Sequence, residues 1–114
     1  MNQPVMRQYE PVRYSRILSL GAARGDLVVT NDDIAGPIDS SDEWIRQRTG
    51  IITRRRASEN RSLMDMAVEA STEAIKKAGI DPSEIGAVLF STITHPHQTP
   101  SAAPLLADLV GANP

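Results

Sequence analysis

The chain has 114 residues, of which 40% are hydrophobic and 23% are charged, and its 14 acidic and 12 basic residues leave a formal net charge of −2. These values are typical of one ordinary globular domain and argue against a disordered chain, a membrane-spanning protein and a globally basic nucleic-acid binder. Because cysteine is absent, disulfides, thiolate metal sites and cysteine nucleophiles are excluded within these residues. We therefore expect a cytoplasmic chain that binds neither nucleic acid nor a membrane.

The first half of the chain predicts short elements separated by turns. Thr30 or Asn31 can cap a first short helix, and Ser40 or Ser41 can cap a second one whose first turn is acidic. In chain order we expect a flexible extension at 1–14, a strand at 16–20, an extended piece at 27–29, a short helix ending at 34, a helix from about 42 to 48, and an exposed strand at 51–55.

The second half carries the strongest helix signal, at 62–78. Ser62 and Asp65 form a weak capping box, an alanine-rich apolar stripe follows, and Gly79 supplies a left-handed end. Residues 81–84 indicate a turn of 3₁₀ or helical character, 87–90 a strand buried on both faces, and 101–110 a last helix capped by Ser101. The alternation predicts an α/β fold with a parallel sheet that looks incomplete.

Charge is uneven along the chain. Five acids and no base lie between Asp32 and Glu43, whereas six of the twelve bases lie between Arg46 and Arg61. Such a local excess of positive charge can attract phosphate. The alternative is that these arginines pair with neighbouring acids on a solvated face. Charge alone leaves both interpretations open.

The common catalytic motifs are absent from the sequence. His95 and His97 could supply two metal ligands, but no third histidine exists. A serine, histidine and aspartate set can be written from Ser91 or Ser101 with Asp108, yet nothing in the sequence brings its members together. We therefore assign no catalytic residue and no metal ligand.

The most informative pair is Trp44 and Arg48. Trp44 is the only tryptophan, and a spacing of four residues places both side chains on one helix face. An exposed indole beside a guanidinium can bind a purine by stacking and cation–π attraction. The alternative is that Trp44 anchors the core and that Arg48 forms a salt bridge.

A family resemblance enters at the same residues. The sequence Ser40-Ser-Asp-Glu-Trp-Ile45 followed by Arg48-Thr-Gly-Ile51 resembles the amino-terminal signature of the β-ketoacyl-acyl carrier protein synthase III family. Further matches in the same order are Val28-Val-Thr-Asn-Asp32, Arg54-Arg55, Ala78-Gly-Ile-Asp-Pro82 and Thr99-Pro-Ser-Ala-Ala103. The resemblance covers residues 15–113, and the sequence is most similar to the actinobacterial branch of the family.

This resemblance implies a fold and an activity. It implies that residues 15–114 are an incomplete amino-terminal half of a thiolase-like, five-layered αβαβα fold that works as a homodimer. Members of the family condense an acyl-coenzyme A primer with malonyl-acyl carrier protein to begin fatty acid synthesis, with the coenzyme A thioester as a substrate and no separate cofactor. By resemblance, Trp44 stacks on the adenine of coenzyme A, Arg48 lines the same face, Thr49 lies close to the coenzyme, and Thr99 shapes the far end of the acyl pocket.

Two departures from the family pattern matter. Position 52 is isoleucine, where relatives often carry a basic residue that can contact phosphate. The family's nucleophilic cysteine and its histidine and asparagine partners match no position here, so we expect the chain alone to be inactive. The alternatives are a polyketide-priming thiolase-like synthase and a non-catalytic remnant that binds a nucleotide or a partner protein.

Overall fold

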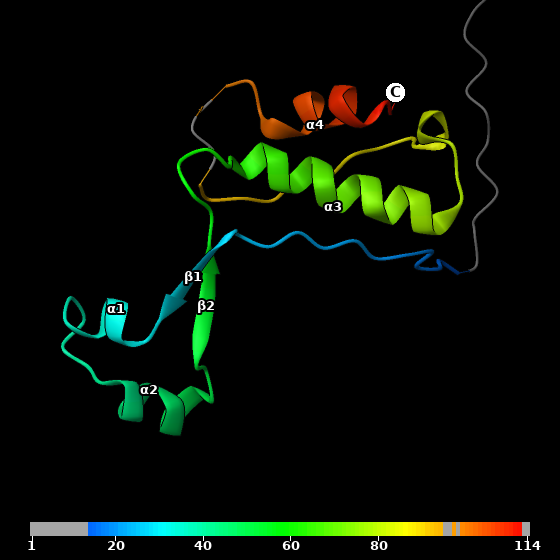
Figure 1. Cartoon of the computed structure of the whole chain (residues 1–114). Coiled ribbons are helices and arrows are strands. Elements are labelled where there is room, and N and C mark those ends of the chain that lie inside the picture. Colours follow the sequence, from blue (N-terminus) through cyan, green and yellow to red (C-terminus); the bar gives the residue numbers. More distant parts are fainter. Residues whose placement is uncertain (1–13, 95–96, 98, 113–114) are drawn as a thin grey trace, which may run out of the picture.

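A computed structural model describes residues 14–94, 97 and 99–112 of the chain. Almost all of the predicted extension at 1–14, and the whole of His95, therefore lie outside the described residues. The elements are, in order, β1 (Leu27–Thr30), α1 (Asp32–Ala35), α2 (Asp42–Thr49), β2 (Thr53–Arg56), α3 (Leu63–Ala78), the 3₁₀ helix η1 (Pro82–Glu84) and α4 (Ala102–Val110). Figure 1 shows α1 and α2 at one end of the β1–β2 ribbon, and α3 and α4 side by side at the other.

The two strands form an antiparallel ribbon. Leu27 pairs with Arg56 and Thr30 pairs with Thr53. β1 is rich in β-branched residues, whereas β2 contains only Thr53 and is held as a strand by its pairing with β1. The expected strand character at 27–29 and 51–55 is therefore confirmed, with bounds shifted by one or two residues. The ribbon holds the two short helices away from α3 (Figure 1).

The long helix α3 begins and ends where its sequence signals predict. The Ser62 hydroxyl accepts a hydrogen bond from the Asp65 backbone N–H at 3.0 Å, and the Asp65 carboxylate accepts one from the Ser62 backbone N–H at 2.8 Å. Gly79 ends the helix in the left-handed conformation with φ of 67°. The expected capping box is therefore confirmed, and so is the 3₁₀ turn at 82–84.

The segment that precedes β1 lies along α3. The Ser19 hydroxyl donates to the Ala74 carbonyl at 2.6 Å, and the Ala22 N–H donates to the Glu73 carboxylate at 2.8 Å. Gly21 makes the approach possible, because a Cβ there would lie 1.9 Å from the Ala70 carbonyl oxygen. The small side chains of α3 thus allow the backbone of residues 19–22 to pack against the helix at close range.

Two strand predictions are wrong. Neither 16–20 nor 87–90 is a strand, and the only sheet among the described residues is the antiparallel β1–β2 ribbon, not a parallel sheet. Leu89, expected to be buried, is 96% exposed. A continuous apolar run predicts burial on both faces of a sheet. A strand, however, forms only where a second backbone supplies its hydrogen bonds.

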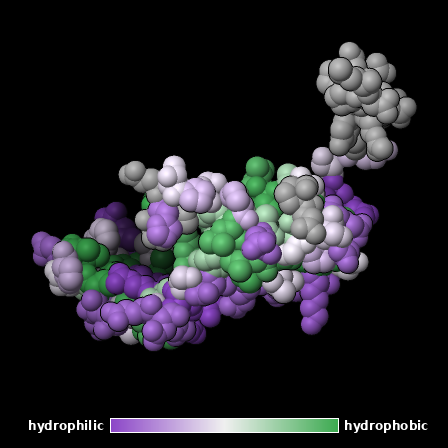
Figure 2. Space-filling model, turned by 90° about the horizontal axis from the view of Figure 1, so that it is seen from above, coloured by the Kyte–Doolittle hydropathy of each residue, from purple (hydrophilic) through white to green (hydrophobic). Residues whose placement is uncertain are grey.

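The described residues bury few large side chains. Figure 2 shows apolar residues gathered on the surface of the α3–α4 half of the molecule. On α4, Leu106 is buried, whereas Leu105 and Leu109 are about half exposed. No helix in the described part of the chain is long and apolar enough to cross a membrane.

Candidate functional site

The helix α2 is defined by local signals at both ends. The Ser41 hydroxyl accepts a hydrogen bond from the Trp44 backbone N–H at 3.2 Å, so Ser41, one of the two expected caps, begins the helix. Gly50 ends it with φ of 71°, and the Gly50 N–H donates to the Arg46 carbonyl at 2.8 Å. These caps place Trp44 in the first turn and Arg48 in the last.

Trp44 and Arg48 lie against each other on the surface. The Arg48 Cζ lies 5.2 Å from the centroid of the Trp44 ring, a cation–π distance, and Trp44 is 52% exposed. Within the described residues Arg48 forms no ion pair. The interpretation of Trp44 as a core anchor beside a salt-bridged Arg48 is therefore wrong.

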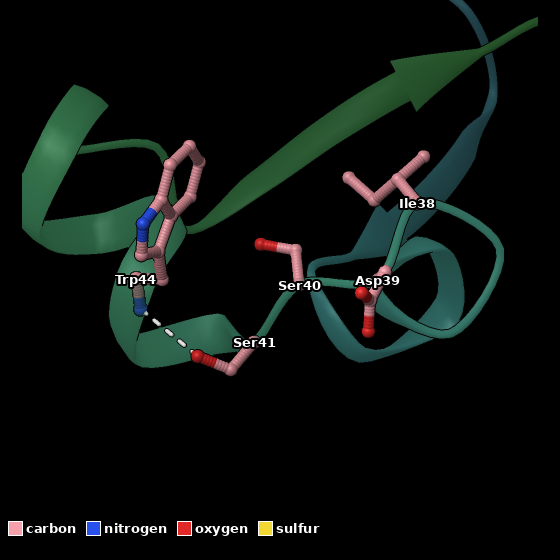
Figure 3. Close-up of a pocket in the computed structure, with 5 residues that line it drawn as sticks. All are labelled: Ile38, Asp39, Ser40, Ser41 and Trp44. Atoms are coloured by element: carbon pink, nitrogen blue, oxygen red, sulfur yellow. Dashed lines mark hydrogen bonds between the residues drawn. The ribbon is translucent and has the colours of Figure 1, made fainter.

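A cavity of about 530 Å³ opens beside the indole. Its lining residues, shown in Figure 3, are Ile38, Asp39, Ser40, Ser41 and Trp44. The Ser40 hydroxyl is buried and has no hydrogen-bond partner, and Figure 3 shows it directed toward the Trp44 side of the cavity. Because solvent does not reach this oxygen, a ligand in the cavity does not reach it either, and the exposed indole is the part of the lining that a ligand can contact.

Thr49 lies at the end of the same helix. Its hydroxyl donates to the Ile45 carbonyl at 2.7 Å and accepts from the Ile51 N–H at 3.1 Å. The hydroxyl therefore already serves to close α2. Thr49 lies one residue from Arg48, but nothing in the contacts of its side chain indicates a ligand.

Asn31 was expected only as a helix cap, and the structure gives it a larger role. It occupies the N-cap position of α1 without capping it, and its side chain is 1% exposed. Its amide nitrogen donates to the Asp42 carboxylate at 2.7 Å and to the Ile51 carbonyl at 2.8 Å, and its amide oxygen accepts from Arg54 at 2.8 Å. These partners are 11, 20 and 23 residues away in sequence, so no local pattern could have revealed them.

The carboxylate of Asp42 joins this network to the exposed side of α2. The Arg46 guanidinium pairs with it at 2.7 Å. Hydrogen bonds from Arg46 first, and from Asn31 second, lower the pKa of Asp42 below its ordinary value. Asp42 therefore remains ionised and is an acceptor for both neighbours.

The arginines between positions 46 and 61 were expected either to pair with neighbouring acids or to leave an excess of positive charge, and the structure shows some of each. Arg46 and Arg61 form ion pairs with Asp42 and Glu69. By contrast, Arg55 and Arg56 on β2 are exposed and have no acidic partner within the part of the chain described here. Pairing with acids thus accounts for only some of the positive charge.

Thr99 is not brought to the Trp44–Arg48 face. It is exposed and lies in the segment leading into α4. Figure 1 shows α4 beside α3, at the other end of the ribbon from α2. No group of three or more potential metal ligands comes together in residues 14–94, 97 and 99–112. The candidate pair His95 and His97 is not tested, because His95 lies outside the described residues.

The chain is similar to a set of curated and solved proteins. It is 54% identical over 92 residues to the β-ketoacyl-[acyl-carrier-protein] synthase III of Tropheryma whipplei, covering 81% of this chain and 29% of that protein. It is 46% identical over 109 residues to the protein of the same name from Kocuria rhizophila, covering 96% of this chain and 31% of that protein. No family model matches the chain.

A solved structure extends the similarity to three dimensions. The chain superposes with a TM-score of 0.84 and 40% identity on the priming β-ketosynthase of a polyketide biosynthetic pathway, covering 96% of this chain and 33% of that one. The predicted fold class, part of a thiolase-like α/β fold, is thereby confirmed. The chain spans about three tenths of the length of the curated relatives it matches (29% and 31%).

Proposed function

Because the chain belongs to the β-ketoacyl-[acyl-carrier-protein] synthase III family and spans 29 to 31% of the length of its curated relatives, we propose that it forms the part of such an enzyme that binds the nucleotide of coenzyme A. The observation that carries this proposal is the exposed Trp44 ring with Arg48 against it, next to a cavity of about 530 Å³.

The chemistry of this face suits an adenine nucleotide. The half-exposed indole offers a flat surface on which a purine can stack, and base stacking on aromatic side chains is favourable for every base. Arg48 adds a positive charge beside the ring, which attracts both the π face of the base and the phosphates. We assign Thr49 to the same binding region as a neighbour of Arg48.

The complete reaction proposed for the parent enzyme is a decarboxylative condensation. A cysteine thiolate attacks the thioester carbonyl of the acyl-coenzyme A primer, and coenzyme A leaves as its thiol. Malonyl-acyl carrier protein then loses carbon dioxide, and the carbanion formed attacks the acyl-enzyme and releases the thiolate. These 114 residues contain no cysteine, so we propose that they bind a substrate and do not catalyse this step alone.

The proposal extends to the cellular location, the oligomeric state and the pathway of the parent enzyme. We propose a cytoplasmic homodimer in fatty acid synthesis in which Thr99 lies at the far end of the acyl pocket. The second candidate is priming of a polyketide pathway, which is favoured by the similarity to a priming β-ketosynthase with a TM-score of 0.84. Both candidates need a coenzyme A thioester at the Trp44 face, so they share the same nucleotide site.

A binding titration tests the nucleotide site. Trp44 is the only tryptophan of the chain, so its emission reports directly on this face. Coenzyme A added to the full chain is expected to quench the emission in a saturable way, because the adenine stacks on the indole. Pantetheine, which lacks the nucleotide, is the matched control and is expected to leave the emission unchanged. Equal responses to both compounds, or none to coenzyme A, would contradict the proposal.

A further inference from the structure

Asn31 connects three segments that are distant in sequence. Among the described residues it is the one polar side chain that is fully buried, at 1% exposure. Its amide nitrogen donates to Asp42 in the first turn of α2 and to the carbonyl of Ile51, which lies two residues beyond the end of that helix. Its amide oxygen accepts from Arg54 on β2. One side chain therefore ties both ends of α2 to the ribbon.

The contact with α2 is on the side away from the candidate binding face. Side chains advance by about 100° per residue around a helix, so Asp42 and Trp44 project about 200° apart. Arg46, which pairs with Asp42, lies on the same side as that carboxylate because it is four residues later. Asn31 thus contacts α2 through groups that do not belong to the Trp44–Arg48 face.

Arg54 fixes the other side of the amide. Its guanidinium donates to the Asn31 oxygen at 2.8 Å and to the Thr30 carbonyl at 3.3 Å. Both amide hydrogens and the amide oxygen of Asn31 are therefore used, and a buried polar group with all its partners is a rigid connection.

From this geometry we infer that Asn31 is a positioning residue, which sets the angle of α2 on the ribbon and thereby presents Trp44 and Arg48 to the nucleotide. It does not touch the ligand. The inference rests on the proposed function, and it names a residue that acts through Asp42 and the Ile51 carbonyl. An asparagine is required because the two α2 contacts need donors and the Arg54 contact needs an acceptor.

The substitution Asn31→Asp tests this requirement with almost no change in volume. Aspartate keeps the acceptor for Arg54 but loses both donors, and it places a second carboxylate against Asp42, whose oxygen is 2.7 Å from the Asn31 nitrogen. We expect the affinity of the full chain for coenzyme A to fall about tenfold or more. In the absence of ligand, we expect the Trp44 emission and its quenching by iodide to change, because α2 is no longer held.

The double substitution Asn31→Asp with Asp42→Asn provides a rescue. It moves the donor to position 42 and the acceptor to position 31, so the hydrogen bond between the two positions forms again and the like charges are removed. We expect it to recover part of the lost affinity, because the Ile51 carbonyl, which accepts from Asn31 at 2.8 Å, still lacks its donor. Gln47→Ala is the matched control, because it removes an exposed hydrogen bond to Glu43 on the same helix, at 3.1 Å, and is expected to bind as the unsubstituted chain does.

The readouts separate positioning from folding. Affinities are compared at a temperature where far-ultraviolet circular dichroism shows each variant to be folded. If Asn31→Asp does not fold, Asn31→Ser, which keeps one donor and adds no charge, replaces it with the same expected direction. A folded variant with unchanged affinity, or a double variant that recovers stability but no affinity, would overturn the inference.

Failure of the proposed function gives a different result. If the unsubstituted chain does not bind coenzyme A, the proposed function fails. The ligand-free Trp44 signal then still decides whether Asn31 orients α2: a changed signal in Asn31→Asp that returns in the double variant supports the positioning role, and an unchanged signal overturns it.

Discussion

Replacement of Trp44 by alanine should weaken coenzyme A binding without unfolding the chain. Stacking of a base on an aromatic side chain contributes about 1–3 kcal/mol, so Trp44→Ala is expected to raise the dissociation constant by about 5- to 150-fold. The cost to folding is smaller than for a core aromatic, because Trp44 already leaves 52% of its surface in water. Loss of the exposed Arg48 contact, 5.2 Å from the ring centroid, adds about 0.5–1 kcal/mol to that cost.

Two further substitutions resolve the contributions of ring and charge. Trp44→Phe keeps an aromatic face of smaller area and should bind with an affinity between those of the unsubstituted chain and Trp44→Ala. Arg48→Met keeps a long aliphatic side chain but removes the cation, so we expect a loss of about two- to fivefold that is greatest at low salt.

The assay must not depend on tryptophan emission, because the substitution removes the only tryptophan. Isothermal titration calorimetry with coenzyme A, at matched temperature and salt, gives the dissociation constant of each variant. Circular dichroism checks that each remains folded. A folded Trp44→Ala chain that binds coenzyme A as tightly as the unsubstituted chain would refute the stacking argument.

Three other outcomes are expected. Gly21→Ala places a Cβ 1.9 Å from the Ala70 carbonyl oxygen of α3, so denaturant unfolding should show a loss of about 1–3 kcal/mol, and unchanged stability would mean that the segment does not pack there. Because the pKa of Asp42 is lowered by Arg46 and Asn31, its stabilising contribution is present above its ordinary pKa of about 4 and is lost as pH falls through the lowered value. The melting temperature should therefore fall below about pH 4, and Asp42→Asn should reduce that dependence; an identical pH profile for both would contradict the assignment. In the complete enzyme, Thr99→Phe should suppress long or branched primers selectively in a primer-competition assay, whereas uniform loss across all primers would contradict a pocket role.

The features predicted correctly depend on residues close together in sequence. The capping box at Ser62 and Asp65, and the glycine end at Gly79, involve atoms within four residues of each other. The proximity of Trp44 and Arg48 follows in the same way from one turn of helix. Whether that pair was exposed or buried needed the surrounding structure, because helical spacing does not say what covers a face.

The strand predictions failed for the opposite reason. Residues 16–20 and 87–90 have the composition of strands, but a strand is defined by hydrogen bonds to another backbone. The first segment lies along α3 instead, where Ser19 bonds to the Ala74 carbonyl. The second has no strand beside it among the described residues.

The amino-acid sequence by itself determined the helices, the caps at Ser41 and Ser62, the family resemblance and the residue pair on α2, because each depends on short-range geometry or on a motif of contiguous residues. The expected cap at Ser101 is wrong, because its side chain makes no hydrogen bond to the start of α4. Only the tertiary structure decided that Asn31 is buried among Asp42, Ile51 and Arg54. It also decided that a cavity opens beside the exposed Trp44 ring. The physical reason is that hydrogen-bond satisfaction and burial belong to the space around a side chain, and segments distant along the chain fill that space.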